Sequence, residues 1–440
     1  MGQGSRRTMT RALAAATAAT GAAAAFAAAG GLDATFGSGG VVHVAVGAST
    51  QLRDVAVQQD GKVLLGGWDR VGTANNHWRI RRIANDGSTD TDFGSSGSVT
   101  LFGSISNADD DLADLSLDGS GRIVAVGDAA VAGKGTSWTR RAAIARLNPS
   151  GSLDTTFGSG GTATLLVSGA SWCEAIGAAH QPDGKIVVAG LAHKSVKSKS
   201  SNADDASIFV ARYTSAGALD ASFGSSGVAV NSASPAGITL SGHGGLALQS
   251  DGGIVVGCSQ NDPGAADQSW RWTIVRFAAD GTPDANFGIV RSSGDRLEAV
   301  AVDASDRVLG FGRRFTATGS DIVVARYGAA GATDTTFGTA GVRTVDLGAL
   351  DVAFDGAVQS DGKIVASVIS GTTSGFSGAT LRLDSDGSLD SRYGTGGVGT
   401  RLFDLLEGNA LVALAPDGRA VAAGYTSNPW EWWSARYDAN

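Results

Sequence analysis

A six-residue phrase recurs along the chain and constrains its fold more than any other feature. The phrase ends in an aromatic residue and a glycine, and an aspartate precedes the aromatic residue by three positions. Its seven copies occupy residues 32–37, 89–94, 153–158, 219–224, 283–288, 333–338 and 389–394. Such repetition is typical of proteins whose units bury their faces against their neighbours. The copies therefore predict a repeat protein, in place of the two or three domains that 440 residues would otherwise suggest.

Each repeat reads as four short strands, which we name a, b, c and d in chain order. In the first full repeat these are residues 54–57, 63–67, 78–83 and 98–101. The turn between a and b carries Asp60-Gly61 at its centre, the strongest short signal for a hairpin. Seven such units predict an all-β fold, a seven-bladed β-propeller of four-stranded antiparallel blades. A linear β-solenoid is the rival architecture, but its coils are shorter and do not suit four antiparallel strands per unit.

The last repeat supplies only strands a, b and c, because the sequence reaches Asn440 without another phrase. The missing parts stand near the start, where the phrase at 32–37 is followed by the apolar run 41–46. We therefore expect the N-terminal strand to complete the last blade and close the ring, which would leave no unpaired sheet edge. The expected single domain spans residues 30–440. Its repeats lie near residues 53–103, 112–168, 173–233, 244–292, 296–346, 352–403 and 409–440, the last completed by 30–47.

An arginine near the end of strand c stands at a fixed distance from the phrase. In the six uninterrupted repeats it precedes the aspartate by eight residues and the aromatic residue by eleven. This constant spacing predicts a structural pair, in which the arginine caps the c–d turn and the aromatic ring packs between blades. One active site would not need seven such pairs, so we assign them no catalytic role. The positions are Arg82, Arg146, Arg212, Arg276, Arg326, Arg382 and Arg436, then Asp33, Asp90, Asp154, Asp220, Asp284, Asp334 and Asp390, then Phe36, Phe93, Phe157, Phe223, Phe287, Phe337 and Tyr393.

The full repeat has a longer recognisable pattern. An apolar run precedes Gln-Pro-Asp-Gly-Lys and a second apolar run that ends in Ala-Gly, as in residues 178–190. Then come Ala-Arg-Leu and Gly-Ser-Leu-Asp-Thr-Thr-Phe-Gly-Ser-Gly-Gly, as in residues 143–161. This pattern resembles the delta-60 repeat family of bacterial proteins and covers essentially everything after residue 30. The resemblance implies a repeat architecture in exported or surface proteins, and it implies no reaction, cofactor or catalytic residue.

The N-terminal stretch resembles a secretory signal. Arg6, Arg7 and Arg11 precede an alanine-rich segment, and three alanines at 27–29 form a small-residue cleavage pattern. We expect residues 1–29 to be a signal peptide and the protein to be exported to the periplasm, the cell surface or the medium. A retained membrane anchor is the alternative, although the segment has few large apolar side chains. Without those three arginines, 31 basic and 42 acidic residues give a net charge of −11, which argues against nucleic-acid binding.

One face of the expected propeller carries the loops whose length varies, namely those between b and c and between d and the next a. Variable loops on a regular scaffold are where binding usually occurs, and all nine tryptophans map to this half of the disc. Aromatic platforms suit sugars, peptides or cell-wall polymers. Trp78, Trp272 and Trp432 stand four residues before the strand-c arginine and are expected to pack between blades. The remaining tryptophans are candidates for ligand binding, with packing as the alternative: Trp68, Trp138, Trp172, Trp270, Trp430 and Trp433.

Three functions stay open from the sequence. The leading hypothesis is a monomeric, non-enzymatic protein that binds a glycan, a peptide or a cell-surface component and needs no cofactor. A metal-dependent hydrolase or lactonase with Asp54, Asp114 and Asp355 at the channel mouth is the second, and a purely structural surface module is the third. The five histidines show no metal-ligand spacing, and no nucleophile elbow occurs. No catalytic or metal-binding residue is therefore assigned.

Overall fold

The fold was analysed in a computed structural model that describes most of residues 29–439. Outside the description lie residues 1–28, 48, 72–74, 104, 106–107, 136, 196–203, 232–238, 242–244, 262–269, 288–294, 373–374, 404–409, 428 and 440. The described part is all β and contains no helix, so none of it forms a helix long and apolar enough to span a membrane. The expected signal peptide falls outside the described residues, apart from Ala29.

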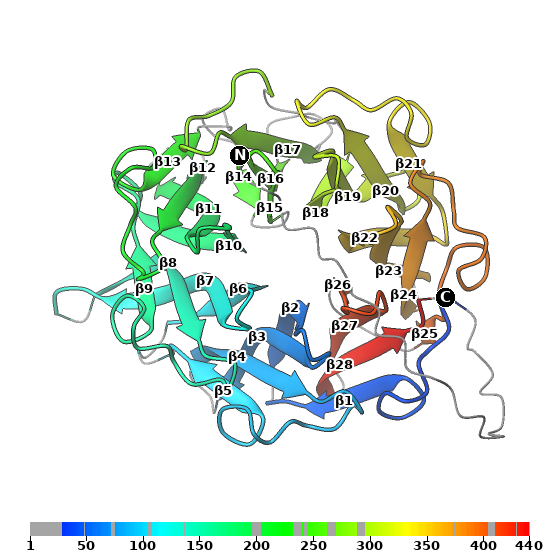
Figure 1. The fold of residues 1–440 in the computed structure, drawn as a ribbon, viewed down its shortest axis with the longest axis horizontal. Helices are drawn as coiled ribbons and strands as arrows, with labels where there is room; N and C mark the ends of the chain where they lie inside the picture. The colour runs from blue at the N-terminus through cyan, green and yellow to red at the C-terminus, as the bar shows by residue number, and fades with distance from the viewer. Residues whose placement is uncertain are drawn as a thin grey trace, which may run out of the picture.

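The strands form antiparallel sheets that are arranged around a common centre (Figure 1). The first sheet consists of β2 (Thr50–Val57), β3 (Val63–Val71), β4 (Asn75–Ile83) and β5 (Ser98–Leu101). The second consists of β6 (Asp111–Leu117), β7 (Ile123–Ala132), β8 (Trp138–Leu147) and β9 (Thr162–Leu165). The third consists of β10 (Trp172–His180), β11 (Ile186–Ser195), β12 (Asp204–Tyr213) and β13 (Val228–Asn231). The prediction of four-stranded antiparallel units is confirmed in these sheets.

The next repeats follow the same plan with local differences. β14 (Thr239–Ser241) and β15 (Leu246–Leu248) both pair with β16 (Ile254–Asn261), which also pairs with β17 (Trp270–Phe277). The short outer strand expected after Phe287 falls outside the described residues. Two further meanders are joined by one parallel pair, Ser320 with Leu350. They are β18 (Asp295–Val302), β19 (Val308–Phe315), β20 (Ser320–Tyr327) and β21 (Val342–Val345), then β22 (Leu350–Val358), β23 (Ile364–Thr372), β24 (Gly375–Leu383) and β25 (Leu402–Phe403).

The last sheet combines both ends of the described chain. β26 (Leu411–Leu414), β27 (Ala420–Ser427) and β28 (Trp430–Tyr437) are followed in space by β1 (Val41–Ala45). β1 pairs antiparallel with β28 from Val41 opposite Ala435 to Ala45 opposite Glu431. The turn before β1 joins in, because the Asp33 amide donates to the Arg436 carbonyl over 2.8 Å. Segments about 400 residues apart in sequence therefore share one sheet (Figure 1).

The a–b turns have the geometry that their sequence predicts. Gly61 has φ = 84°, and its amide donates to the Gln58 carbonyl over 2.9 Å. Glycine suits this left-handed conformation because it lacks a Cβ. In the β18–β19 turn Asp306 takes this place with φ = 61°, a conformation that aspartate tolerates better than most residues. The degraded sequence of that turn therefore still supports a hairpin.

The inner strands differ from the prediction in one respect. β2, β6, β10, β18 and β22 each contain a β-bulge, at which two residues oppose one on the neighbouring strand. A bulge bends its strand and turns the following side chain in a new direction. The extra residues are Arg53, Ala113, Ile176, Glu298 and Phe354.

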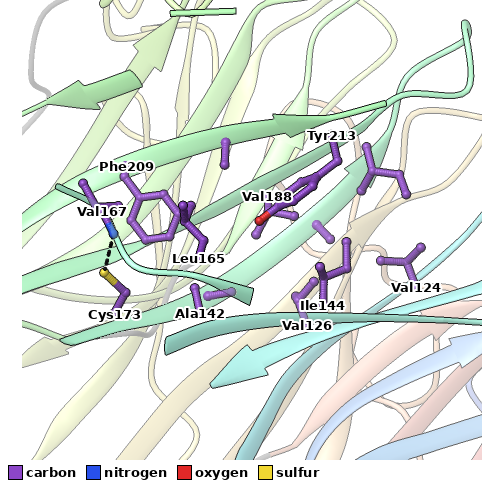
Figure 2. Packing of buried hydrophobic residues seen from close by; sticks show 14 of the residues in the cluster. Val124, Val126, Ala142, Ile144, Leu165, Val167, Cys173, Val188, Phe209 and Tyr213 are labelled. Atoms are coloured by element: carbon purple, nitrogen blue, oxygen red, sulfur yellow. Dashed lines mark hydrogen bonds between the residues drawn. The ribbon is translucent and has the colours of Figure 1, made fainter. Parts of the chain in front are cut away.

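The core lies between neighbouring sheets. Figure 2 shows one cluster, in which Val126 and Ile144 of the second sheet pack with Val188 and Tyr213 of the third. Each sheet thus buries its faces against its neighbours, as the repeat architecture requires. Cys173 lies in this cluster, and its sulfur accepts a hydrogen bond from the Val167 amide at 3.4 Å. Cys173 and Cys258 are both buried.

Candidate functional site at the mouth of the central channel

The arginine of strand c contacts the aspartate of the phrase in all seven copies. In the copy at residues 283–288, Arg276 pairs with Asp284. The other nitrogen–oxygen distances are 2.8 Å for Arg82–Asp90, Arg146–Asp154, Arg212–Asp220 and Arg326–Asp334, 2.9 Å for Arg382–Asp390 and 2.7 Å for Arg436–Asp33. In six copies the guanidinium also lies over the aromatic ring, 4.3 to 4.7 Å from its centroid. Guanidinium, carboxylate and ring therefore form one buried unit.

This unit joins neighbouring sheets. Arg212 donates to the Ala279 carbonyl of the next sheet over 2.7 Å, and the Gly158 amide donates to the Ala216 carbonyl over 2.8 Å. Burial alone would raise the pKa of Asp390, but hydrogen bonds and the charges of Lys363 and Arg382 lower it to about 2. A buried ion pair whose remaining hydrogen bonds are satisfied is costly to break. The units thus hold neighbouring sheets of the scaffold together.

The sequence analysis missed a third member of these units, the basic residue that ends each a–b turn. Lys62 lies 2.9 Å from Asp90, Lys185 3.2 Å from Asp220, and Lys363 2.8 Å from Asp390. Arg122, Arg307 and Arg419 take the same place beside Asp154, Asp334 and Asp33. In the fourth sheet the position is Gly253, and Arg276 instead pairs additionally with Asp251. The recurring Asp-Gly-Lys triplet was the signal that could have revealed this role.

The inner strands surround a cavity of about 410 Å³ at the centre of the arrangement. Its lining includes residues from β2, β6, β10, β15, β18, β22 and β26. Among the described residues that line it, seven are acidic and one, Arg53, is basic. The acids are Asp54, Asp111, Asp114, Asp128, Glu174, Glu298 and Asp355. The channel is therefore strongly acidic.

Asp54, Asp114 and Asp355 occupy equivalent positions, directly after the bulge residue of their strands. Each carboxylate accepts a hydrogen bond from a backbone amide of the next inner strand. The distances are 2.7 Å from the Leu115 amide to Asp54, 2.7 Å from the Ala178 amide to Asp114 and 3.0 Å from the Val412 amide to Asp355. The sequence analysis placed these three residues at the channel mouth, and they line the channel.

The surroundings of this trio favour the neutral form of the carboxyl groups. Burial raises the pKa of Asp355 to about 7. Burial, followed by the negative charges of Asp114 and Asp355, raises the pKa of Asp54 well above its usual range. Burial also raises the pKa of Asp114, against the opposing effect of the hydrogen bond from the Ala178 amide. Among the described residues that line the cavity, Arg53 is the one basic side chain beside the trio, whereas each phrase aspartate pairs with its own arginine.

Two tryptophans each contact a histidine or arginine side chain, which in turn contacts an acidic residue of the cavity lining. Trp172 stacks on the His193 ring with centroids 3.6 Å apart, and His193 Nε2 lies 3.1 Å from Glu174. The Arg296 guanidinium lies 4.6 Å from the centroid of the Trp270 ring and 3.3 Å from Glu298. Aromatic surface and carboxylates therefore meet on two sides of the channel.

The nine tryptophans divide by exposure. Trp138 is 39% exposed, and Trp172, Trp270 and Trp430 are partly exposed. Trp78, Trp272 and Trp432 are fully buried, which agrees with the expected packing role. Trp68 and Trp433 are also buried, at 9% and 2% exposure, so their rings offer no open face to a ligand. The candidate binding set is thereby reduced to Trp138, Trp172, Trp270 and Trp430.

The acidic channel does not have the geometry of a metal centre. In the described part of the chain, no group of three or more His, Cys, Asp or Glu side chains is arranged to hold a metal ion. Asp54, Asp114 and Asp355 instead direct carboxylate oxygens at backbone amides. The residues present do not fit the metal that the hydrolase hypothesis requires, and we derive no reaction step from it.

Comparison with known proteins supports the repeat architecture. Five stretches match a family model described as a β-propeller domain of unknown function (DUF5122), namely residues 58–93, 119–157, 181–223, 249–287 and 359–393. Each stretch runs from an a–b turn, or the residues just before it, to the aromatic residue of the phrase. No curated protein sequence matches the chain.

Solved structures with a similar fold share little sequence with the chain. Semaphorin 2a from Drosophila is 9% identical, with a TM-score of 0.51, over 94% of this chain and 77% of that chain. The β-propeller domain of the Trilobed protease from Pyrococcus furiosus is 11% identical, with a TM-score of 0.41, over 89% and 99%. A PL25 polysaccharide lyase, an ulvan lyase, is 10% identical, with a TM-score of 0.45, over 91% and 94%. At this identity the likeness concerns the fold alone. The narrower delta-60 name stays a prediction, and the five matched stretches support a β-propeller repeat family.

Proposed function

We propose that the chain forms a closed, seven-bladed ring. Support comes from the inner strands, because each contacts the next in the order β2, β6, β10, β15, β18, β22 and β26, and β26 contacts β2. The joints of the last sheet also resemble the internal ones. The Gly394 amide donates to the Ala29 carbonyl over 2.6 Å, and the Gly37 amide donates to the Asp86 carbonyl over 2.8 Å. The N-terminal segment thus makes the contacts between neighbouring sheets that a c–d turn makes in the other repeats.

On this ring, the chain binds a glycan at the mouth of the channel. The observation that carries the proposal is the Trp172–His193–Glu174 arrangement, in which a partly exposed indole adjoins a carboxylate of the channel lining. The apolar face of a sugar can pack on an indole, while its hydroxyl groups donate to carboxylates. Trp270 and Glu298, linked through Arg296, offer the same combination on another inner strand. A binding role requires no catalytic group and agrees with the scaffold role of the seven Arg–Asp pairs.

A glycan array probed with the purified chain tests this proposal. Trp172→Ala and Trp270→Ala should each weaken glycan binding at least tenfold, because each removes a stacking surface. Leu219→Ala is the matched control, since Leu219 is a 37% exposed apolar side chain of the phrase, in a c–d turn. Unchanged glycan binding by both tryptophan variants would reject the site. Binding of basic peptides in place of glycans would change the ligand class, and a folded chain that binds neither would favour the structural module.

We also propose export, on the basis of the N-terminal sequence pattern. Cell fractionation should recover the chain outside the cytoplasm, shortened by about 29 residues as measured by mass spectrometry. Recovery of the full-length chain from the cytoplasm would refute export.

A further inference from the structure

Three of the joints around the channel depend on aspartates that lie close to one another. The Asp54 carboxylate ties β2 to β6, the Asp114 carboxylate ties β6 to β10, and the Asp355 carboxylate ties β22 to β26. The equivalent positions in the other repeats are Gly177, Gly245, Ala299 and Leu411, which have no carboxyl group. The trio is therefore a special feature of this chain and not part of the repeated scaffold.

The trio lies in a strongly negative environment. Glu174 is next to His193, Asp128 is 3.1 Å from Arg140, and Glu298 adjoins Arg296 and Arg313. Among the described residues that line the cavity together with the trio, the basic one is Arg53. The charged lining groups besides the trio are Arg53 on β2, Asp111 on β6, Asp128 on β7, Glu174 on β10 and Glu298 on β18. The uncharged Gly245 lies just before β15, and β15 and β26 contribute the uncharged Leu246 and Leu411.

We propose that Asp54, Asp114 and Asp355 act together as a proton-dependent latch of the channel. When protons neutralise the trio, the carboxyl groups hold the three joints by hydrogen bonds without mutual repulsion. When the protons leave, three negative charges converge in a narrow space and weaken the same joints. The latch would thus tighten the ring in mildly acidic surroundings and loosen it in alkaline ones.

The electrostatics agree with the geometry. The negative charges of Asp114 and Asp355 act on the buried Asp54 carboxyl, so its neutral form is favoured. Burial, with like charge for Asp54, raises the pKa of all three groups. A folded-state pKa above the unfolded value means that the native state binds more protons between the two values, so stability falls as pH rises. For Asp355 this window runs from about pH 4 to about pH 7.

Equilibrium unfolding measured from pH 5 to pH 9 provides the first test. Between the unfolded-state and folded-state pKa values of a group, each extra proton that the native state holds lowers the folding equilibrium constant tenfold for every unit by which the pH rises. Asp355→Asn should remove about one proton from this dependence, and the triple variant with Asp54→Asn and Asp114→Asn should remove more than the single variant does. Asparagine keeps an oxygen that accepts the hydrogen bond from the backbone amide, but its side chain cannot ionise. Asp92→Asn, at an exposed position beside a phrase aspartate, should keep the wild-type dependence.

Other buried groups contribute to the pH dependence as well. Burial raises the pKa of Asp128 and Glu298, so their contributions fall as pH rises, as those of the trio do. Burial lowers the pKa of His180, so its contribution to stability rises with pH. Differences between each asparagine variant and the wild type cancel these contributions. A triple variant that retains the wild-type pH dependence would overturn the proposal.

Hydrogen exchange provides a second test that uses the intact wild-type chain. The amides of Leu115, Ala178 and Val412 donate to the trio, so their protection should fall above pH 7, after correction for the intrinsic pH dependence of exchange. The Asp33 amide, which donates to the Arg436 carbonyl in the last sheet, should keep its protection. Equal loss at both sites, or loss at neither, would contradict a latch at the channel.

Discussion

Phe36 and Phe157 offer a direct comparison between the discontinuous blade and a continuous one. Phe36 belongs to the N-terminal phrase and Phe157 to an internal phrase, and neither ring is exposed. Each ring centroid lies 4.6 Å from the guanidinium of its arginine, Arg436 for Phe36 and Arg146 for Phe157. Phe36 lies in a cluster formed by the last and first sheets, which includes Val63. The two rings therefore have matched surroundings although one of them is far from its arginine in sequence.

We expect Phe36→Ala and Phe157→Ala to cost the same free energy of unfolding. Loss of a fully buried phenylalanine ring costs about 3–5 kcal/mol, a large part of the roughly 5–15 kcal/mol by which a folded domain is stable. The measurement is chemical denaturation of both variants and the wild type at one pH, with the slope of the transition checked for two-state behaviour.

The comparison separates a clasp from a loose terminal strand. If residues 29–45 only rested on the last sheet, they would detach locally, and Phe36→Ala would cost no more than that detachment. A loss below about 1 kcal/mol for Phe36→Ala, alongside about 3–5 kcal/mol for Phe157→Ala, would refute the closed ring. Equal losses would mean that the N-terminal strand unfolds together with the whole ring.

Two further predictions concern the Arg–Asp units. Arg146→Ala leaves the buried Asp154 carboxylate without its partner at 2.8 Å, so it should cost about 3–5 kcal/mol in denaturation experiments; recovery by Arg146→Lys would contradict the requirement for a planar guanidinium. The phrase aspartates should govern acid unfolding. Asp390 has a pKa of about 2 because hydrogen bonding and the charges of Lys363 and Arg382 outweigh burial, so its contribution is present above about pH 4 and is lost as pH falls toward 2. Asp390→Asn should flatten the decline in stability measured between pH 4 and pH 2, and an unchanged decline would refute this assignment.

The periodic features of the fold were predictable from the sequence. Strand d of the first repeat was expected at residues 98–101, which are the bounds of β5. The a–b turns and the Arg–Asp spacing were equally visible, since each depends on residues close together in sequence. The bulges were not visible, because one extra residue in a short apolar strand leaves no clear mark in its alternation.

The exposure of individual tryptophans was less predictable. Strand b of the first repeat was expected to end at Gly67, whereas β3 extends to Val71 and Trp68 pairs with Trp78 inside the sheet. Trp433 lies opposite His43 of β1, so a strand from the other end of the chain adjoins it. Exposure at these positions depends on strand length and on distant pairing, and neither is a local property of the sequence.

The aspartates show how position in the fold determines the pKa of one residue type. Each phrase aspartate pairs with the arginine of strand c, and in six repeats it also contacts a second basic residue. Its negative charge is therefore balanced by residues of one or two neighbouring sheets. Asp54, Asp114 and Asp355 lie on the inner strands, where positions from different repeats converge on the same space. A carboxyl group that is harmless in one repeat becomes a repulsive neighbour of its equivalents there. The pKa is lowered at the phrase and raised at the channel for this reason. The proposed latch thus depends on inner strands of different repeats lining one cavity, and a single isolated repeat could not have it.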